Sequence, residues 1–181
     1  YIVSNLNEAK PTFFVIVPLI AEMIYDRIWK EARKTGKETL LRRAVAVNNK
    51  TKAIGLDAGR FLFKAVTGKL GGRLNTIVSA ASAISPAIVR GFEDFGITVL
   101  QAYGLTETSP LIAATPRLSK DRYKKAGSTG LCNITGELKI VGQNADGIGE
   151  VYFRGPNVML GYYKMPEATA AVMDGDWFNT G

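Results

Sequence analysis

The first part of the chain alternates between short apolar runs and stretches with helical periodicity. Residues 11–17 are a compact run rich in Phe, Val and Ile, which predicts a buried strand. In residues 19–35, apolar side chains recur three and four positions apart, which predicts an amphipathic helix. Pro18 suits the first turn of this helix, and Gly36 suits the position just after its last turn. We therefore expect the chain to open with a strand and an amphipathic helix.

The pattern is less regular in the following segment. A short basic helix is predicted within residues 38–58, followed by a polar turn around Asn48-Asn49-Lys50. Residues 61–70 are again apolar at helical spacing and end at the glycine pair Gly71-Gly72. We therefore expect two further helices before the next strand.

The clearest unit of the chain follows this glycine pair. Residues 74–78 form an apolar run that predicts a strand. Ser85 can cap a helix that begins at Pro86 and ends at Gly96. A second apolar run, residues 97–101, predicts another strand. Strand, helix and strand in this order predict a right-handed crossover between parallel strands.

The pattern changes to strict alternation after about residue 126. Residues 136–141 and 149–154 alternate like antiparallel strands, with the turn-rich segment 142–147 between them. A further strand is predicted over 158–163 and a short helix over 166–173.

These elements predict the fold class α/β. A parallel βαβ sheet layer is expected over residues 1–126, and a small antiparallel β-rich subdomain over residues 127–181. No flexible linker separates the two parts, so we expect two packed subdomains.

Composition excludes several kinds of chemistry. The 181 residues are 46% hydrophobic and 22% charged, which is typical of a globular domain with one core. Histidine is absent, which excludes Ser-His-Asp and Cys-His catalysis from this segment. The single cysteine, Cys132, excludes an internal disulfide and indicates a reducing compartment, the cytoplasm. We expect Cys132 to be a small buried residue.

The net charge of +7 is unevenly distributed. Residues 1–75 hold 14 Lys and Arg against 6 Asp and Glu, whereas residues 76–181 hold 9 against 10. A basic half can attract a phosphate-bearing cofactor or an anionic membrane surface, or it can be a solvated helix face. No aromatic residues are interleaved with these charges in a recognised pattern, so nucleic-acid binding is not expected.

The segment from Gln101 to Pro110 combines residue types that suit a nucleotide bound with a metal ion. The ring of Tyr103 can stack on a base, and Gly104 lets the backbone approach a ligand closely. The hydroxyl of Thr106 can donate to a phosphate, and the carboxylate of Glu107 is a hard oxygen ligand for Mg²⁺. The same residues also suit a strand followed by a capped turn, and spacing leaves both interpretations open.

Two special loops are predicted at the same edge of the sheet. Residues 79–83 and 103–108 each follow the carboxyl end of a strand in the crossover unit. Ligands of open α/β sheets bind beyond these ends. The two loops are therefore expected to face one ligand if their strands are neighbours.

The segment around Glu107 resembles the core motif of adenylate-forming enzymes, the superfamily of acyl-CoA synthetases, luciferases and peptide-synthetase adenylation domains. The resemblance extends along most of the chain, and residues 10–25 are similar to long-chain fatty acyl-CoA synthetases. Further similar stretches are Gly127-Ser128-Thr129-Gly130, residues 149–163 and the closing segment 176–181.

The resemblance implies a role for each residue of the motif. Glu107 is implied to bind the Mg²⁺ that bridges the ATP phosphates, and Thr106 to contact the α-phosphate and the attacking carboxylate. Tyr103 is implied to stack on adenine, and Gly104 to lie near the acyl group or the adenylate. Residues 149–163 are expected to be mainly architectural.

A second loop is implied to contact adenine, mostly through its backbone. It contains Ala81 and Ser82, and here the sequence departs from the family. Ala83 stands where proline is common, and Ala102 replaces a frequent glycine. Small residues still permit close approach, although the backbone has less conformational freedom.

The implied reaction has two steps, and its substrates are a fatty acid, ATP and coenzyme A. The fatty acid carboxylate attacks the α-phosphate to give acyl-adenylate and pyrophosphate, and the thiol of coenzyme A then displaces AMP. The resemblance also implies a phosphate loop before Tyr1, a ribose-binding aspartate after Gly181 and a catalytic lysine further on. We therefore expect the chain to be part of a longer enzyme and inactive by itself.

Two alternatives remain open. One is an adenylating enzyme for another carboxylic acid, such as an amino acid, an aryl acid or a short-chain acid. The other is a non-catalytic nucleotide-binding or membrane-surface module on the same fold, which the basic half of the chain keeps open. Thr106 and Glu107, which are both present, favour catalysis.

Overall fold

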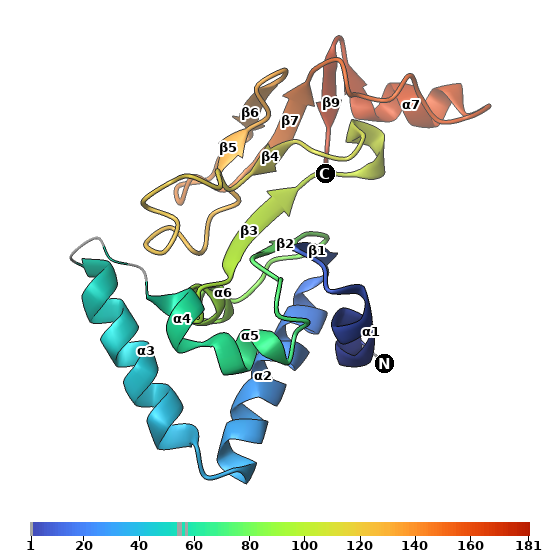
Figure 1. Cartoon of the computed structure of the whole chain (residues 1–181). Helices are drawn as coiled ribbons and strands as arrows, with labels where there is room; N and C mark the ends of the chain where they lie inside the picture. Colours follow the sequence, from blue (N-terminus) through green and yellow to red (C-terminus); the bar gives the residue numbers. More distant parts are fainter. Residues whose placement is uncertain (1, 54–55, 57) are drawn as a thin grey trace. The chain divides into compact units, whose positions relative to one another are not determined.

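The structure, a computed structural model, describes residues 2–53, 56 and 58–181, and it divides into two compact units (Figure 1). The first unit holds the chain up to Gln101 together with Arg117–Ser128. The second holds Ala102–Pro116 and Thr129–Gly181. The chain therefore crosses between the two units three times rather than once.

This division differs from the boundary predicted between residues 126 and 127. Residues 102–116 belong to the second unit, because the end of one strand leaves the parallel sheet there. Ala102 and Tyr103 pair antiparallel with Ala114 and Ala113. The chain passes again into the second unit after residue 128, where the change to alternating apolar and polar residues marks the boundary in the sequence. The antiparallel pairing of residues 102 and 103 leaves no such pattern in the local sequence.

The first unit is built from helices around three parallel strands. Its elements are α1 (Ile2–Ala9), β1 (Phe13–Ile16), α2 (Pro18–Lys34), α3 (Glu38–Ala53), α4 (Gly59–Leu62), α5 (Lys64–Gly68), β2 (Thr76–Ser79), α6 (Pro86–Asp94) and β3 (Thr98–Tyr103). β2 pairs parallel with β1 on one side and with β3 on the other. The predicted α/β class and the parallel crossover from β2 through α6 to β3 are confirmed.

The ends of α6 follow the predicted chemistry. The Ser85 side chain accepts a hydrogen bond from the Ala87 amide at 3.3 Å, and Pro86 occupies the first helical position. Gly96 follows the helix with a positive φ of 77°. Capping by Ser85 satisfies a backbone donor that the first turn of the helix would otherwise leave unpaired.

α3 is longer than the sequence predicted. It runs through the expected polar turn at residues 48–50 and ends at Ala53. The Asn48 side chain is fully buried, and its Nδ2 donates to the Asp94 carbonyl at 3.0 Å. The prediction of a turn was therefore wrong, because Asn48 forms a hydrogen bond between α3 and α6.

β1 forms where it was predicted but is not buried. Phe13 and Val15 are 52% and 61% exposed, whereas Ile16 is buried. β1 is the first strand in the sheet order, and alternate side chains of a strand point to opposite faces. The core of the first unit covers one of these faces.

The second unit is mainly antiparallel. Its elements are the 3₁₀ turn η1 (Thr106–Thr108), β4 (Ala113–Ala114), β5 (Leu131–Cys132), β6 (Glu137–Val141), β7 (Glu150–Arg154), α7 (Pro166–Val172), β8 (Met173–Asp174) and β9 (Trp177–Asn179). One sheet has the order β6-β7-β9-β8, and the end of β3 pairs with β4, which pairs with β5. The predicted antiparallel pair over 137–154 and the helix at 166 are confirmed.

Two predictions for this unit were wrong. Residues 158–163 form an irregular loop instead of a strand, and the Met159 amide donates to the Glu107 carbonyl at 2.7 Å. Cys132 is exposed rather than buried, since it lies on β5 at the end of the strand order.

Of the helices that the structure describes, none is both long enough and apolar enough to span a membrane.

The core of the first unit depends on a close approach between α2 and α6. The ring of Tyr25 on α2 packs against Phe92 and Phe95, with ring centroids 5.6 and 5.8 Å apart. A Cβ atom on Gly91 would lie 2.4 Å from the Tyr25 ring. Glycine is therefore required at this helix contact for lack of space.

We predict that Gly91→Ala destabilises the protein by about 1–3 kcal/mol, because the added methyl group overpacks the contact with Tyr25. Gly68→Ala is the matched control, since a Cβ atom there meets nothing within 4 Å. It should raise stability by up to about 1 kcal/mol through its higher helix propensity. Urea unfolding of both variants measures the difference, and equal midpoints would contradict the prediction.

Candidate functional site

The loop between β3 and β4 carries most of the predicted chemistry. Tyr103 ends β3, Gly104 and Leu105 follow, and η1 then presents Thr106 and Glu107. The side chain of Thr106 is exposed and that of Glu107 is partly exposed. A hydroxyl and a carboxylate from adjacent residues are therefore accessible on one turn.

Close backbone packing gives this loop its shape. A Cβ atom on Gly104 would lie 1.8 Å from the Pro110 carbonyl oxygen, so a side chain cannot be accommodated. Thr108 is fully buried. Its Oγ1 donates to the Leu105 carbonyl and accepts from the Leu105 amide, both at 3.0 Å. Local bonds thus hold the turn that carries Thr106 and Glu107.

A second segment holds the loop from outside. Asn157 donates from Nδ2 to the carbonyl oxygens of Thr108 and of Leu111, the latter at 3.0 Å. The Met159 amide donates to the Glu107 carbonyl at 2.7 Å. These bonds join residues about fifty positions apart, so the segment expected to be architectural fixes the predicted catalytic turn.

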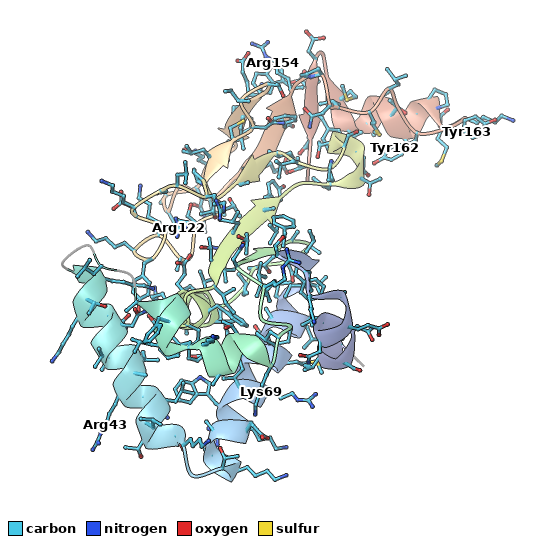
Figure 2. The ribbon with its side chains drawn as sticks, in the orientation of Figure 1. Arg43, Lys69, Arg122, Arg154, Tyr162 and Tyr163 are labelled. Carbon is cyan, nitrogen blue, oxygen red and sulfur yellow. The ribbon has the colours of Figure 1, made fainter. Side chains whose placement is uncertain are left out.

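Tyr162 contacts the Glu107 carboxylate directly, which the sequence analysis missed. Its hydroxyl donates to Oε1 of Glu107 at 2.8 Å. This hydrogen bond to a carboxylate is the main cause that raises the pKa of Tyr162 above its ordinary value, with desolvation second. Tyr162 and Tyr163 lie just before α7 (Figure 2). The tyrosine pair after Gly161 was the available signal in the sequence.

Tyr103 is held by its hydroxyl as well as by packing. The hydroxyl donates to Oγ1 of Thr180 at 2.8 Å, and Thr180 donates in turn to the Val151 carbonyl at 2.9 Å. The ring packs against the small cluster of Ile112, Ala113 and Phe153. The half-buried ring is therefore fixed in orientation, and stacking on adenine stays a prediction.

The second predicted loop lies in the first unit. Ala81 and Ser82 follow β2 and are exposed, and Ala81 has a positive φ of 80°. Ser79, which ends β2, pairs with Gln101 of β3. The two strands are thus neighbours, as the prediction required, and a ligand shared by the two loops stays a prediction.

The residues of the turn match the needs of a magnesium ion bound with phosphates. Within residues 2–53, 56 and 58–181, no three His, Cys, Asp or Glu side chains gather as a metal cluster. Mg²⁺ in nucleotide sites needs only one or two protein carboxylates, because phosphates and water supply its other ligands. Glu107 accepts one hydrogen bond, and a carboxylate has further lone pairs to offer. A single-carboxylate Mg²⁺–phosphate site therefore fits these residues.

The sequence is similar to known enzymes along almost its whole length. A sequence model of the family "AMP-binding enzyme" matches residues 1–163. Long chain acyl-CoA synthetase 7, peroxisomal, from Arabidopsis thaliana is 34% identical over 95% of this chain and 26% of its own length. Long-chain-fatty-acid–CoA ligase 1 from Homo sapiens is 32% identical over 99% of this chain and 27% of its own length. The chain thus spans about a quarter of these curated relatives.

Solved structures share the fold at lower identity. The N-terminal domain of FACL13 from Mycobacterium tuberculosis matches 99% of this chain and 37% of its own, with a TM-score of 0.63 and 19% identity. The amide bond synthetase McbA from Marinactinospora thermotolerans matches 99% of this chain and 30% of its own, with a TM-score of 0.64 and 21% identity. These likenesses support the fold assignment.

We predict that Gly104→Ala destabilises the second unit by about 3 kcal/mol or more, because the new methyl group would meet backbone that cannot move aside. Gly127→Ala is the control, since its Cβ atom would make an ordinary 3.5 Å contact with Pro86. Thermal unfolding measures the difference. A Gly104→Ala protein as stable as the control would show that the loop can rearrange.

We also predict that Glu107→Gln lowers the pKa of Tyr162 toward its ordinary value of about 10, since the charged acceptor is lost. In the native protein this hydrogen bond stabilises the fold when the pH is below the ordinary pKa of tyrosine. Its contribution is lost as the pH rises through the raised pKa of Tyr162. Nuclear magnetic resonance of ¹³C-labelled tyrosine, assigned with Tyr162→Phe, follows the titration. Asp146→Asn, in the exposed β6–β7 turn, should leave it unchanged. Identical titrations in native protein and Glu107→Gln would refute the contact.

Proposed function

Because the chain belongs to the AMP-binding enzyme family, we propose that it is the part of a long-chain fatty acid–CoA ligase that carries the catalytic turn. One observation supports this most directly. Thr106 and Glu107 are accessible on a rigid turn, and a neutral hydroxyl orients the carboxylate of Glu107. Long-chain substrates are supported by the names of relatives that are 32–34% identical.

The proposed reaction begins with adenylation. A carboxylate oxygen of the fatty acid forms a bond to the α-phosphorus of ATP, and the bond to the leaving pyrophosphate breaks. The acid is already ionised at neutral pH, so this step needs no general base and tolerates the absence of histidine. Catalysis of this kind depends mainly on positioning and on stabilising charge.

Each predicted residue has a task in this step. The hydroxyl of Thr106 would donate to an α-phosphate oxygen, and Glu107 would hold the cation that accompanies the phosphates. Bound Mg²⁺ would supply charge neutralisation. Tyr103 would stack on adenine, Gly104 would lie near the acyl group or the adenylate, and Ala81 and Ser82 stay proposed adenine contacts. In the second step the thiol of coenzyme A attacks the acyl carbon, and AMP leaves.

The basic first half supports a second, smaller proposal. Residues 1–75 hold 14 Lys and Arg against 6 Asp and Glu. We propose a cytoplasmic protein whose basic half attracts anionic membrane surfaces, as clustered Lys and Arg residues do. Such attachment would be peripheral and would weaken as salt is added.

We predict that Glu107→Ala lowers palmitate-dependent ATP–pyrophosphate exchange by about 100-fold or more in the full-length protein, the scale on which a lost electrostatic contact to the transition state is felt. Asp146→Ala is the control, an exposed acidic residue in the turn between β6 and β7. Exchange that survives Glu107→Ala would refute the proposed role of this carboxylate.

The choice of acid tests the substrate within the same assay. Palmitate, acetate, benzoate and an amino acid mixture are compared at equal concentration. Exchange with an acid other than palmitate would keep adenylation and overturn the long-chain assignment. No exchange with any acid, from folded protein, would favour a nucleotide-binding module.

A further inference from the structure

A cleft of about 680 Å³ opens within the first unit, between α2, α3 and α5. α2 and α3 diverge from the turn that joins them, and α5 lies across the open side (Figure 1). The lining residues that the structure describes include none of the predicted adenylation residues. The volume lies within the range of about 300–1,000 Å³ that is usual for small-molecule sites.

The lining of the cleft is mainly apolar. Its floor is formed by Ile24, Phe63 and Leu70, which are 4%, 1% and 2% exposed. At its lip, Leu40 and Leu62 are 67% and 37% exposed. A ligand with an apolar body would remove this surface from water, which the hydrophobic effect favours.

Charge at the mouth is positive. Among the lining side chains, Arg27, Lys37 and Lys69 are cationic and Glu31 is anionic. Nζ of Lys69 lies 3.3 Å from Oε1 of Glu31, so one cation is offset. The remaining net positive charge favours a ligand that carries a negative group at the entrance.

We propose that this cleft binds one long-chain carboxylate, with its chain on the apolar floor and its carboxylate beside Arg27 and Lys37. A concave, apolar site with a few polar groups is typical of a small-molecule ligand. A bilayer surface would instead be met by an exposed amphipathic helix face. The described lining of the cleft includes none of the proposed adenylation residues, and the proposal does not rest on the proposed function.

The first test fills the cleft. Ala44 lines it from α3, whereas Ala46 on the same helix is exposed and is not part of the lining. Palmitate binding to the full-length protein is measured by isothermal titration calorimetry below the concentration at which palmitate aggregates. Ala44→Trp should weaken binding at this site at least tenfold, and Ala46→Trp should leave it unchanged.

The second test changes the charge at the cleft without filling it. It therefore tests the proposal even if the Ala44→Trp protein does not fold. Arg27→Glu combined with Lys37→Glu should weaken palmitate binding at least tenfold. Binding of hexadecanol, which has the same chain without the charge, should change little. Arg43→Glu is the control, because Arg43 projects from the other side of α3, away from α2 (Figure 2).

The outcomes separate this site from the proposed enzyme site. Glu107→Ala should keep the binding that Ala44→Trp removes, whether or not the protein adenylates palmitate. Palmitate binding that is equal in the native protein and both cleft variants would overturn the proposal. A second result would also overturn the proposal. In it, phosphatidylglycerol vesicles bind native and Ala44→Trp protein equally, whereas soluble palmitate binds neither. The positive charge would then be assigned to a membrane surface.

Discussion

The contact between the backbone of Gly104 and the carbonyl of Pro110 is the constraint on which the candidate site depends. The two approach so closely that a single methyl group would lie 1.8 Å from the oxygen. This approach folds the chain back on itself immediately after β3, so that η1 stands at the end of the strand. Thr106 and Glu107 owe their position to that reversal. Thr108, buried and bonded at both its donor and acceptor, then closes the turn from within.

The partner of Glu107 is chemically informative. A lysine or arginine at 2.8 Å would cancel the charge that a cation needs, whereas the hydroxyl of Tyr162 orients the carboxylate and leaves its charge in place. The second support, from the Met159 amide to the Glu107 carbonyl, fixes the backbone instead of the side chain. One hydrogen bond therefore fixes the backbone of Glu107, and another orients its carboxylate without removing the negative charge. This arrangement suits phosphate chemistry, in which the protein contributes mainly geometry and electrostatics.

The predictable and unpredictable parts of the fold differ in the distance between interacting residues. The crossover from β2 to β3 was predictable because Ser85, Pro86 and Gly96 punctuate apolar runs within about thirty residues. Tyr162 lies 55 positions from Glu107, and no local period reveals that pair. Asn48 was misjudged for the same reason. Its polarity predicts a turn, whereas in the fold it is buried and bonds to a helix 46 positions away.

That bond to α6 is also one of the contacts that position α3 beside the cleft in the first unit. Asn48 and Lys52 tie the end of α3 to the carbonyl oxygens of Asp94 and Glu93 on α6. Near the start of α3, the guanidinium of Arg42 lies 4.9 Å from the centre of the Trp29 ring on α2. α3 is therefore anchored near its start to α2 and near its end to α6. A helix pair with a free hinge would bury its leucines by collapsing, which the hydrophobic effect favours. Leu40, near the start of α3, is 67% exposed and lines the cleft, where a ligand can bury it.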